Sequence, residues 1–208
     1  INYLVKGDTF IEEHIQGIPG DSFIGHYLTE HSDYNPIRIA KEFVKFNERC
    51  LVQLLGDMRG DNFIVEVIPD FDELHFRMRA IDFDQECYEG SSRIYLPQYF
   101  KENNPIINLG LKNMSPVVEF QYQKEERMRL LNRARAAHAQ LHTLLQAMAI
   151  DTLSAPEHVL QLKNELSELY QDVEFLKAET MGEIVRTSIN MLERYPVRKR
   201  VTIKPFVS

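Results

Sequence analysis

Residues 54–85 constrain the fold of this chain more than any other stretch. Two segments within it carry strand patterns: residues 62–68 are rich in β-branched and aromatic side chains, and residues 74–80 alternate apolar with polar side chains. Residues 69–72, Pro-Asp-Phe-Asp, are typical of a turn. We therefore expect an antiparallel hairpin, in which the start of the first strand lies beside the end of the second.

Oxygen-bearing side chains flank this expected hairpin at one end. Pairing of the strands brings Asn62 and Asp82 together, with Asp57, Asp61 and Asp84 close by. Four carboxylates in one place repel one another unless a cation neutralises them, and hard oxygen ligands suit Mg²⁺ or Mn²⁺. The sequence thus predicts a divalent metal site at the hairpin end.

The same residues resemble a known family. Asp57 is followed five positions later by Asn62, then by a strand, a hairpin and the run Ile81-Asp82-Phe83-Asp84. This order resembles the catalytic loop and the metal-binding loop of the protein-kinase-like fold. It is most similar to the aminoglycoside and choline phosphotransferase type, in which a Gly-Asp loop leads to an Asn and the metal aspartate follows an isoleucine.

The resemblance implies a role for each of these residues. Asp57 would be the catalytic base that accepts or orients the acceptor hydroxyl, and Asn62 and Asp82 would be the metal ligands. Two positions depart from the family pattern: Leu55 stands where a histidine is usual, and Asp84 stands where a glycine ends the Asp-Phe-Gly triplet. These departures leave room for a degenerate, inactive site.

The N-terminal segment has a looser resemblance. Residues 4–15 contain a break at residues 6–8 and then a strand-like run, followed by a Gly/Pro-rich loop. In the family, this would be the end of the small lobe and the hinge, so Glu13, His14 and Ile15 would bind the adenine of the nucleotide. An ordinary β-hairpin with a Gly/Pro-rich exit explains the same pattern.

A helix is predicted to lead into the catalytic loop. Asn35 and Pro36 are typical of an N-cap and a first helical position. The apolar residues that follow keep helical spacing to the loop: Ile39, Phe43, Phe46, Cys50 and Leu54. We expect this face, including Cys50, to be buried in the core rather than Cys50 to be a nucleophile.

The second half of the chain is predicted to be helical. Residues 125–149 form one long amphipathic pattern, with His138 expected in the core and His142 facing outward. Ser154-Ala155-Pro156-Glu157 resembles a capping box that opens a second helix. A third helix is expected to end at Tyr195-Pro196, and residues 201–204 fit an edge strand or an ordered tail.

Taken together, the resemblance implies an α+β fold, a protein-kinase-like large lobe that is mainly helical and carries its catalytic and metal loops on a β-hairpin. Residues 1–20 would be a remnant of the small lobe and hinge, and residues 21–208 the large lobe. The chain begins with Ile1 rather than Met, so we expect a fragment or a processed product.

Composition narrows the classes of partner. The formal net charge of -7 over 208 residues argues against nucleic acid as the main partner, because phosphate binding needs clustered cations. We see no apolar run long enough to span a membrane and no signal peptide, and so expect no membrane partner. Cys50 and Cys87 make neither a disulfide framework nor a zinc motif, which favours a reducing, cytoplasmic location.

The function implied by the resemblance is ATP-dependent, Mg²⁺-assisted (or Mn²⁺-assisted) phosphoryl transfer to a hydroxyl acceptor, with a small molecule as the expected acceptor. The chain has no glycine-rich loop, no strand lysine and no helix glutamate to hold the phosphates, so we expect it to be weakly active or inactive alone. Two alternatives stay open: an inactive pseudokinase or helical protein-interaction module, and a metal-dependent hydrolase. The acceptor's identity and the oligomeric state are left open by the sequence.

Overall fold

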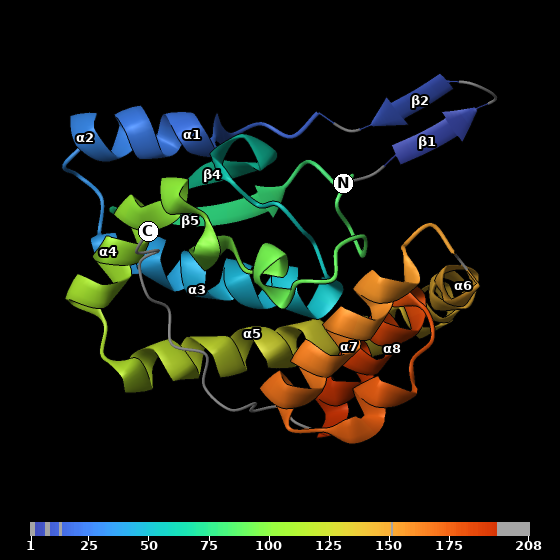
Figure 1. Cartoon of the computed structure of the whole chain (residues 1–208). Coiled ribbons are helices and arrows are strands. Elements are labelled where there is room, and N and C mark those ends of the chain that lie inside the picture. The colour runs from blue at the N-terminus through green and yellow to red at the C-terminus, as the bar shows by residue number, and fades with distance from the viewer. Residues whose placement is uncertain (1–2, 7–8, 13, 151, 195–208) are drawn as a thin grey trace.

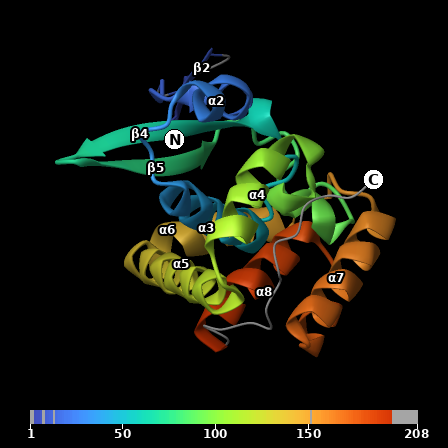
Figure 2. The same cartoon turned by 90° about the vertical axis from the view of Figure 1, so that its left-hand side faces the viewer.

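The computed structural model describes residues 3–6, 9–12, 14–150 and 152–194. They form an α+β structure that is mainly helical, as expected, with a small antiparallel sheet. Figure 1 shows this sheet between the helical segment α1–α2 and helix α3, with α5, α7 and α8 on the far side of α3. Figure 2 shows α5, α8 and α7 forming one helical layer. The expected tail strand at residues 201–204 lies outside the described residues.

The predicted hairpin is confirmed. Strands β4 (Phe63–Asp70) and β5 (Glu73–Ala80) pair antiparallel, and the turn between them is shortened to two residues, of which Phe71 has a positive φ of 50°. A short strand β3 (Ile18–Pro19) pairs with β4 on the other side, so the sheet order is β3-β4-β5. Strands β1 (Tyr3–Lys6) and β2 (Thr9–Glu12) form a separate two-stranded sheet.

Helix α3 (Pro36–Gln53) begins as predicted. The Asn35 side chain accepts a hydrogen bond from the Ile37 N–H, and Pro36 occupies the first turn, where its missing N–H costs nothing. The stripe Ile39, Phe43, Phe46, Cys50 and Leu54 is fully buried. Burial raises the pKa of the Cys50 thiol, so this cysteine is a core residue and not a nucleophile, as expected.

The remaining helices and helical turns precede α3 or follow the hairpin. Their bounds are α1 (Gly20–Ser22), a single π-helical turn (Phe23–Tyr27), α2 (Leu28–Glu30), α4 (Asn104–Asn113), α5 (Pro116–Ala136), α6 (His138–Ala149), α7 (Pro156–Tyr170) and α8 (Met181–Arg194). Between β5 and α4, residues 81–103 contain three short 3-10 turns at Ser92–Tyr95, Pro97–Tyr99 and Lys101–Asn103, and a further 3-10 turn covers Val173–Lys177.

Three expectations for the second half are wrong. The predicted single helix 125–149 is two helices, α5 and α6, because the backbone turns at Ala137 (φ -106°, ψ 25°). His138 is exposed rather than buried in the core, whereas His142 faces outward as predicted. The capping box does not form: Ala155 caps α7 without a side-chain bond, and the Ser154 hydroxyl instead donates to the Cys87 carbonyl oxygen at 2.9 Å. The predicted stop of the third helix at Tyr195-Pro196 lies outside the described residues.

Two large apolar clusters fill the interior. One lies between the β4–β5 hairpin, α3 and α4, and includes Phe23, Phe43, Phe46 and Phe63. The other joins the end of α3 to α6, α7 and α8, and includes Leu51, Leu162, Leu166 and Ile184. Helix α3 contributes to both clusters and therefore connects the sheet to the helical layer.

A buried ion network lies where α3, α5 and β5 meet. Arg49 on α3 contacts Glu42 on the same helix (Nη2 to Oε1, 2.5 Å) and Glu126 on α5 (Nη1 to Oε1, 3.1 Å), and donates to the Met78 carbonyl oxygen at 3.0 Å. Glu42 in turn accepts from the Met78 N–H at 3.0 Å. Burial lowers the pKa of Arg49, but the Glu42 and Glu126 carboxylates outweigh it, and the net shift is upward.

Leu141→Asp tests how firmly α6 is attached to the helical layer. Leu141 is half buried against the cluster of α6, α7 and α8, so an aspartate there places a charge on an apolar surface and should cost about 1–3 kcal/mol of unfolding free energy. Urea unfolding measures the change. Leu144→Asp is the matched control, since Leu144 lies on the same helix and is 55% exposed. Equal stabilities of the two variants would show that α6 is not packed on the layer.

Candidate functional site

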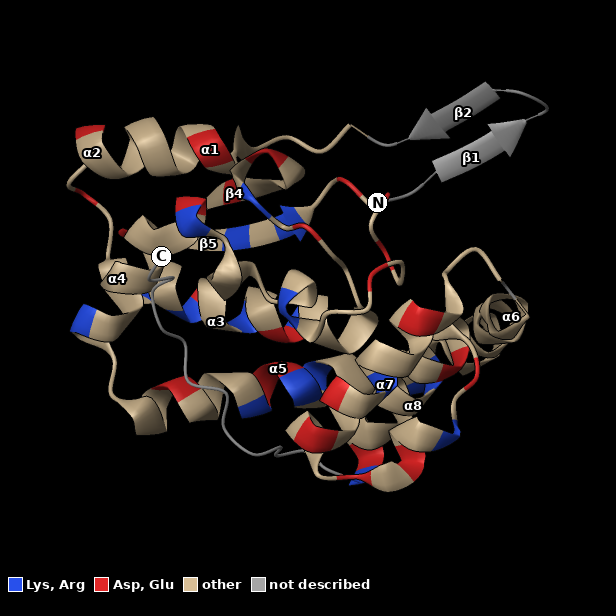
Figure 3. Ribbon diagram, in the orientation of Figure 1, with Lys and Arg blue, Asp and Glu red and all other residues tan. Residues whose placement is uncertain are grey.

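The β4–β5 register brings the two predicted metal ligands to one end of the hairpin. Phe63 is paired with Ala80. One residue beyond this pair, the Ile81 N–H donates a hydrogen bond to the Asn62 carbonyl oxygen at 3.0 Å. Asn62 and Asp82 therefore lie on neighbouring chain segments, offset by one residue. Figure 3 shows acidic positions in the loop that leaves β5.

The loop between α3 and β4 has an unusual backbone. Leu54, the residue that follows helix α3, has a left-handed conformation (φ 52°), and Asp57 also has a positive φ of 54°. A positive φ is uncommon for residues other than glycine and tends to occur at functional sites, where the surrounding structure holds it in place. Here the Asp57 N–H donates to the Ile94 carbonyl oxygen at 3.0 Å, and the Met58 carbonyl oxygen accepts from the Asn103 side chain at 3.0 Å.

The Asp57 carboxylate is engaged by an arginine of its own loop. Arg59 donates from Nε to Oδ1 at 3.0 Å and from Nη2 to Oδ2 at 2.9 Å, a bidentate arrangement that is among the stronger hydrogen-bonded ion pairs. The Asp57 side chain is 18% exposed and that of Arg59 is 48% exposed. The hydrogen bond and charge of Asp57 raise the pKa of Arg59, with smaller contributions from Asp61 and Glu102. The guanidinium therefore covers and orients the carboxylate.

The Asn62 side chain links the end of the loop between α3 and β4 to its start. Its side-chain Nδ2 donates to the Asp57 carbonyl oxygen at 2.7 Å and lies 3.4 Å from the Asp57 Oδ2. Because the amide nitrogen takes these contacts, the Oδ1 oxygen of Asn62 is directed away from Asp57. That oxygen is the atom with which an asparagine coordinates a metal.

Asp82 lies in a local turn just after β5. It is half buried, and its Oδ1 accepts a hydrogen bond from the Asp84 N–H at 3.1 Å, as in an Asx-turn. Turn formation alone therefore accounts in part for the presence of an aspartate at position 82. The bond also fixes the side chain, because a carboxylate held at one oxygen keeps a defined orientation for the other.

The loop before β4 and the loop after β5 lie side by side. The Cys87 N–H donates to the Leu54 carbonyl oxygen at 3.0 Å. Gly56 lies so close to the second loop that a Cβ atom there would be 2.6 Å from the Gln85 carbonyl oxygen. A side chain at position 56 would push the two loops apart, so glycine is required for their approach.

The prediction that four carboxylates cluster at the hairpin end is wrong. Among the described residues, no three or more His, Cys, Asp or Glu side chains are grouped so that they could hold a metal ion. Asp57 is paired with Arg59, and Asp61 and Asp84 are exposed. Asn62 and Asp82, the two predicted metal ligands, lie on neighbouring segments. Mg²⁺ is commonly held by one or two protein oxygens together with substrate phosphates and water.

Only part of the segment predicted to bind adenine belongs to the residues that the structure describes. Glu13 lies outside the described residues. His14 is exposed and Ile15 is half buried, and both belong to the irregular stretch that leads into β3. The register of β3, with Ile18 paired to Val65, places this stretch beside β4.

Sequence reasoning missed three residues that support the Asp57 loop: Arg59, Ile94 and Asn103. Asn103 is fully buried and bridges two loops by donating to the carbonyl oxygens of Met58 and Pro97. Only Arg59 carried a detectable signal, since it is a cation two positions from the predicted base. The contacts of Ile94 and Asn103 join residues about forty positions apart and leave no local pattern.

Comparisons of the chain with protein-family models, with curated proteins and with solved structures found no match. Within the described part of the chain, none of the helices has the length and apolar character needed to cross a membrane.

Proposed function

We propose that this chain carries the acceptor-activating and metal-binding loops of an ATP-dependent phosphotransferase that acts on a hydroxyl group, with a small molecule as the acceptor. The observation that supports it most is the arrangement of three side chains at one end of the hairpin. Asn62 hydrogen-bonds the loop of Asp57 and is adjacent, through the Ile81 hydrogen bond, to Asp82.

Asp57 would be the general base. It has a positive φ, its side chain is 18% exposed, and its two carboxylate oxygens accept hydrogen bonds from Arg59. A carboxylate within hydrogen-bond reach of an acceptor hydroxyl orients it and takes its proton as the phosphoryl group is transferred. The Arg59 guanidinium fixes the direction of the carboxylate and places a positive charge next to it.

Asn62 and Asp82 supply the donors for a metal ion. Their Oδ atoms are hard oxygen ligands on two adjacent segments, which fits Mg²⁺ or Mn²⁺ with the remaining positions taken by phosphate and water. A metal bound there would neutralise the phosphate charge that develops during transfer. His14 and Ile15 would receive the adenine, since they lead into β3 beside the hairpin.

One observation favours an inactive relative of such enzymes as a second candidate. The bidentate Arg59 contact occupies both oxygens of Asp57, and a base held in this way must exchange a guanidinium hydrogen bond before it can accept a proton. An inactive protein of this kind would bind a nucleotide, or a protein partner through its helices, without turnover.

Nucleotide titration of ligand variants tests the proposal. Asp82→Asn and Asn62→Ala should each weaken Mg²⁺-dependent binding of a non-hydrolysable ATP analogue by about tenfold or more, because the first replaces an anionic ligand by a neutral, weaker one and the second removes a ligand. Asp61→Asn is the matched control, since Asp61 is exposed in the same loop.

Circular dichroism should show all three variants folded. Unchanged metal-nucleotide affinity in both ligand variants would refute the metal assignment. Metal binding that needs no nucleotide would favour a metal-dependent hydrolase instead.

A further inference from the structure

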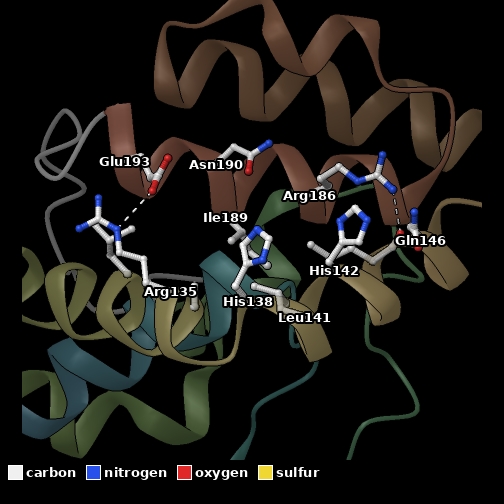
Figure 4. Close-up of a pocket in the computed structure, with 12 residues that line it drawn as sticks. Arg135, His138, Leu141, His142, Gln146, Arg186, Ile189, Asn190 and Glu193 are labelled. Atoms are coloured by element: carbon white, nitrogen blue, oxygen red, sulfur yellow. Dashed lines mark hydrogen bonds and ion pairs between the residues drawn. The ribbon is translucent and has the colours of Figure 1, made fainter.

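A hollow of about 400 Å³ lies between the end of α5, helix α6 and helix α8. It is separate from the loops around Asp57, since its lining residues all come from positions 131–193. Figure 4 shows side chains of α6 and α8 facing each other across it. Its volume falls within the range of small-molecule sites, which is about 300–1,000 Å³.

The floor of this hollow is apolar. It is formed by side chains from all three helices: Leu131, Ala134, Leu141, Leu145 and Ile189. Leu131 and Leu145 are buried, while Leu141 and Ile189 are half buried against the core. The lining residues come from both sides of the break between α5 and α6 at Ala137, together with α8.

Cationic and polar side chains form its rim. Arg186 donates from Nη2 to the Leu145 carbonyl oxygen at 3.0 Å, which fixes its guanidinium over the hollow (Figure 4). Arg135 contacts Glu193 at 3.3 Å, with both side chains 59% exposed. The rings of His138 and His142 are parallel, with centroids 6.2 Å apart. The lining thus holds two arginines and one carboxylate, on a chain whose formal net charge is -7. Arg135 pairs with that carboxylate, Glu193, at one end of the hollow, and Arg186 lies at the opposite end (Figure 4).

This combination of groups selects a class of ligand. An arginine has five N–H donors, so a single bond from Arg186 to a carbonyl leaves others for a carboxylate. The apolar floor would bury an alkyl or aryl body, which contributes about 25 cal/mol for each Å² removed from water. A cationic head group at Arg186 would be repelled by the guanidinium and be disfavoured.

We propose that the hollow between α5, α6 and α8 is a binding site for a small amphipathic carboxylate, with its apolar body on the leucine floor and its anionic head at Arg186. The exposed histidines contribute hydrogen-bonding edges at the entrance. This site does not depend on the phosphotransferase proposal, since the two share no residues.

Isothermal titration with a matched ligand series tests this site. Decanoate, decanol and decylammonium have the same alkyl body and differ in the head group, and each is used below the concentration at which it forms micelles. We expect decanoate to bind saturably at one site and at least about tenfold more tightly than decylammonium, with decanol between them. Equal binding of decanoate and decylammonium, or no saturable binding of decanoate, would overturn the proposal.

Two variant pairs locate the site. Ala134→Leu should fill the hollow and weaken decanoate binding about tenfold, whereas Ala139→Leu, which changes an exposed position on α6 outside the lining, should not. Arg186→Gln should reduce the preference for decanoate over decanol. Arg186→Lys, which keeps the positive charge, is the matched control and should retain the preference; if Arg186→Gln does not fold, the Ala134→Leu pair and the ligand series still decide the proposal. Decanoate binding unaffected by Ala134→Leu would place the ligand elsewhere and contradict the assignment.

Discussion

Replacing Asp57 with asparagine is expected to lower the turnover of phosphoryl transfer by about a hundredfold or more, while the affinity for the metal–nucleotide complex stays nearly unchanged. Asparagine keeps the shape of the side chain and its hydrogen-bonding reach but accepts no proton. In the proposed function, Asp57 acts on the acceptor hydroxyl and is not a principal metal ligand. The loss should therefore appear in kcat.

Steady-state phosphoryl transfer and nucleotide titration on the natural protein separate the two quantities. The control is Asp61→Asn, which removes a carboxylate from the same loop at an exposed position. If Asp57→Asn loses nucleotide binding as severely as Asp82→Asn, the two carboxylates share a metal, and the hydrolase alternative should replace the phosphotransferase.

Arg49→Met is expected to be the most destabilising of the charge changes proposed for this chain, by about 3–5 kcal/mol. The substitution removes the cation that contacts Glu42 on α3 and Glu126 on α5, whose side chains are 11% and 1% exposed. It also removes a donor to the Met78 carbonyl oxygen on β5. The carboxylates then stay buried without this counter-charge, and the connection between sheet and helical layer is weakened.

Chemical denaturation measures this effect, and Arg79→Met is the matched control. Arg79 also forms an ion pair, with Glu66 at 2.9 Å across the hairpin, but its side chain is 36% exposed. Partly exposed pairs contribute about 0–1 kcal/mol, so the control should change stability little. Similar small losses in both variants would show that the Arg49 network is dispensable to the fold.

The hairpin was predictable from sequence because its signals are local. Alternation in residues 74–80 and the β-branched run in residues 62–68 fix which faces are buried, and the turn residues fix the register. The start of α3 was predictable for the same reason, since Asn35 and Pro36 act on the adjacent backbone. The proximity of Asn62 to Asp82 then follows from antiparallel pairing alone.

The features that the sequence did not predict depend on contacts between distant segments. Residues 133–140 contain good helix formers and no proline or glycine, yet the helix breaks at Ala137, because packing of α6 against α8 decides its direction. Likewise, the Asp57–Arg59 ion pair replaced the expected carboxylate cluster. A local arginine neutralises one carboxylate, so the repulsion that predicted a metal among four of them is reduced.

Paramagnetic broadening by Mn²⁺ tests most directly whether Asn62 and Asp82 hold one metal together with a nucleotide. In isotope-labelled natural protein, Mn²⁺ with a non-hydrolysable ATP analogue should broaden the amide signals of Asn62, Asp82 and Phe83 beyond detection. The signals of Ile184 and Leu192 in α8 should remain, and Mn²⁺ without the nucleotide should have little effect. Broadening that is absent at the hairpin end, or that is centred on Asp57 without nucleotide, would contradict the account.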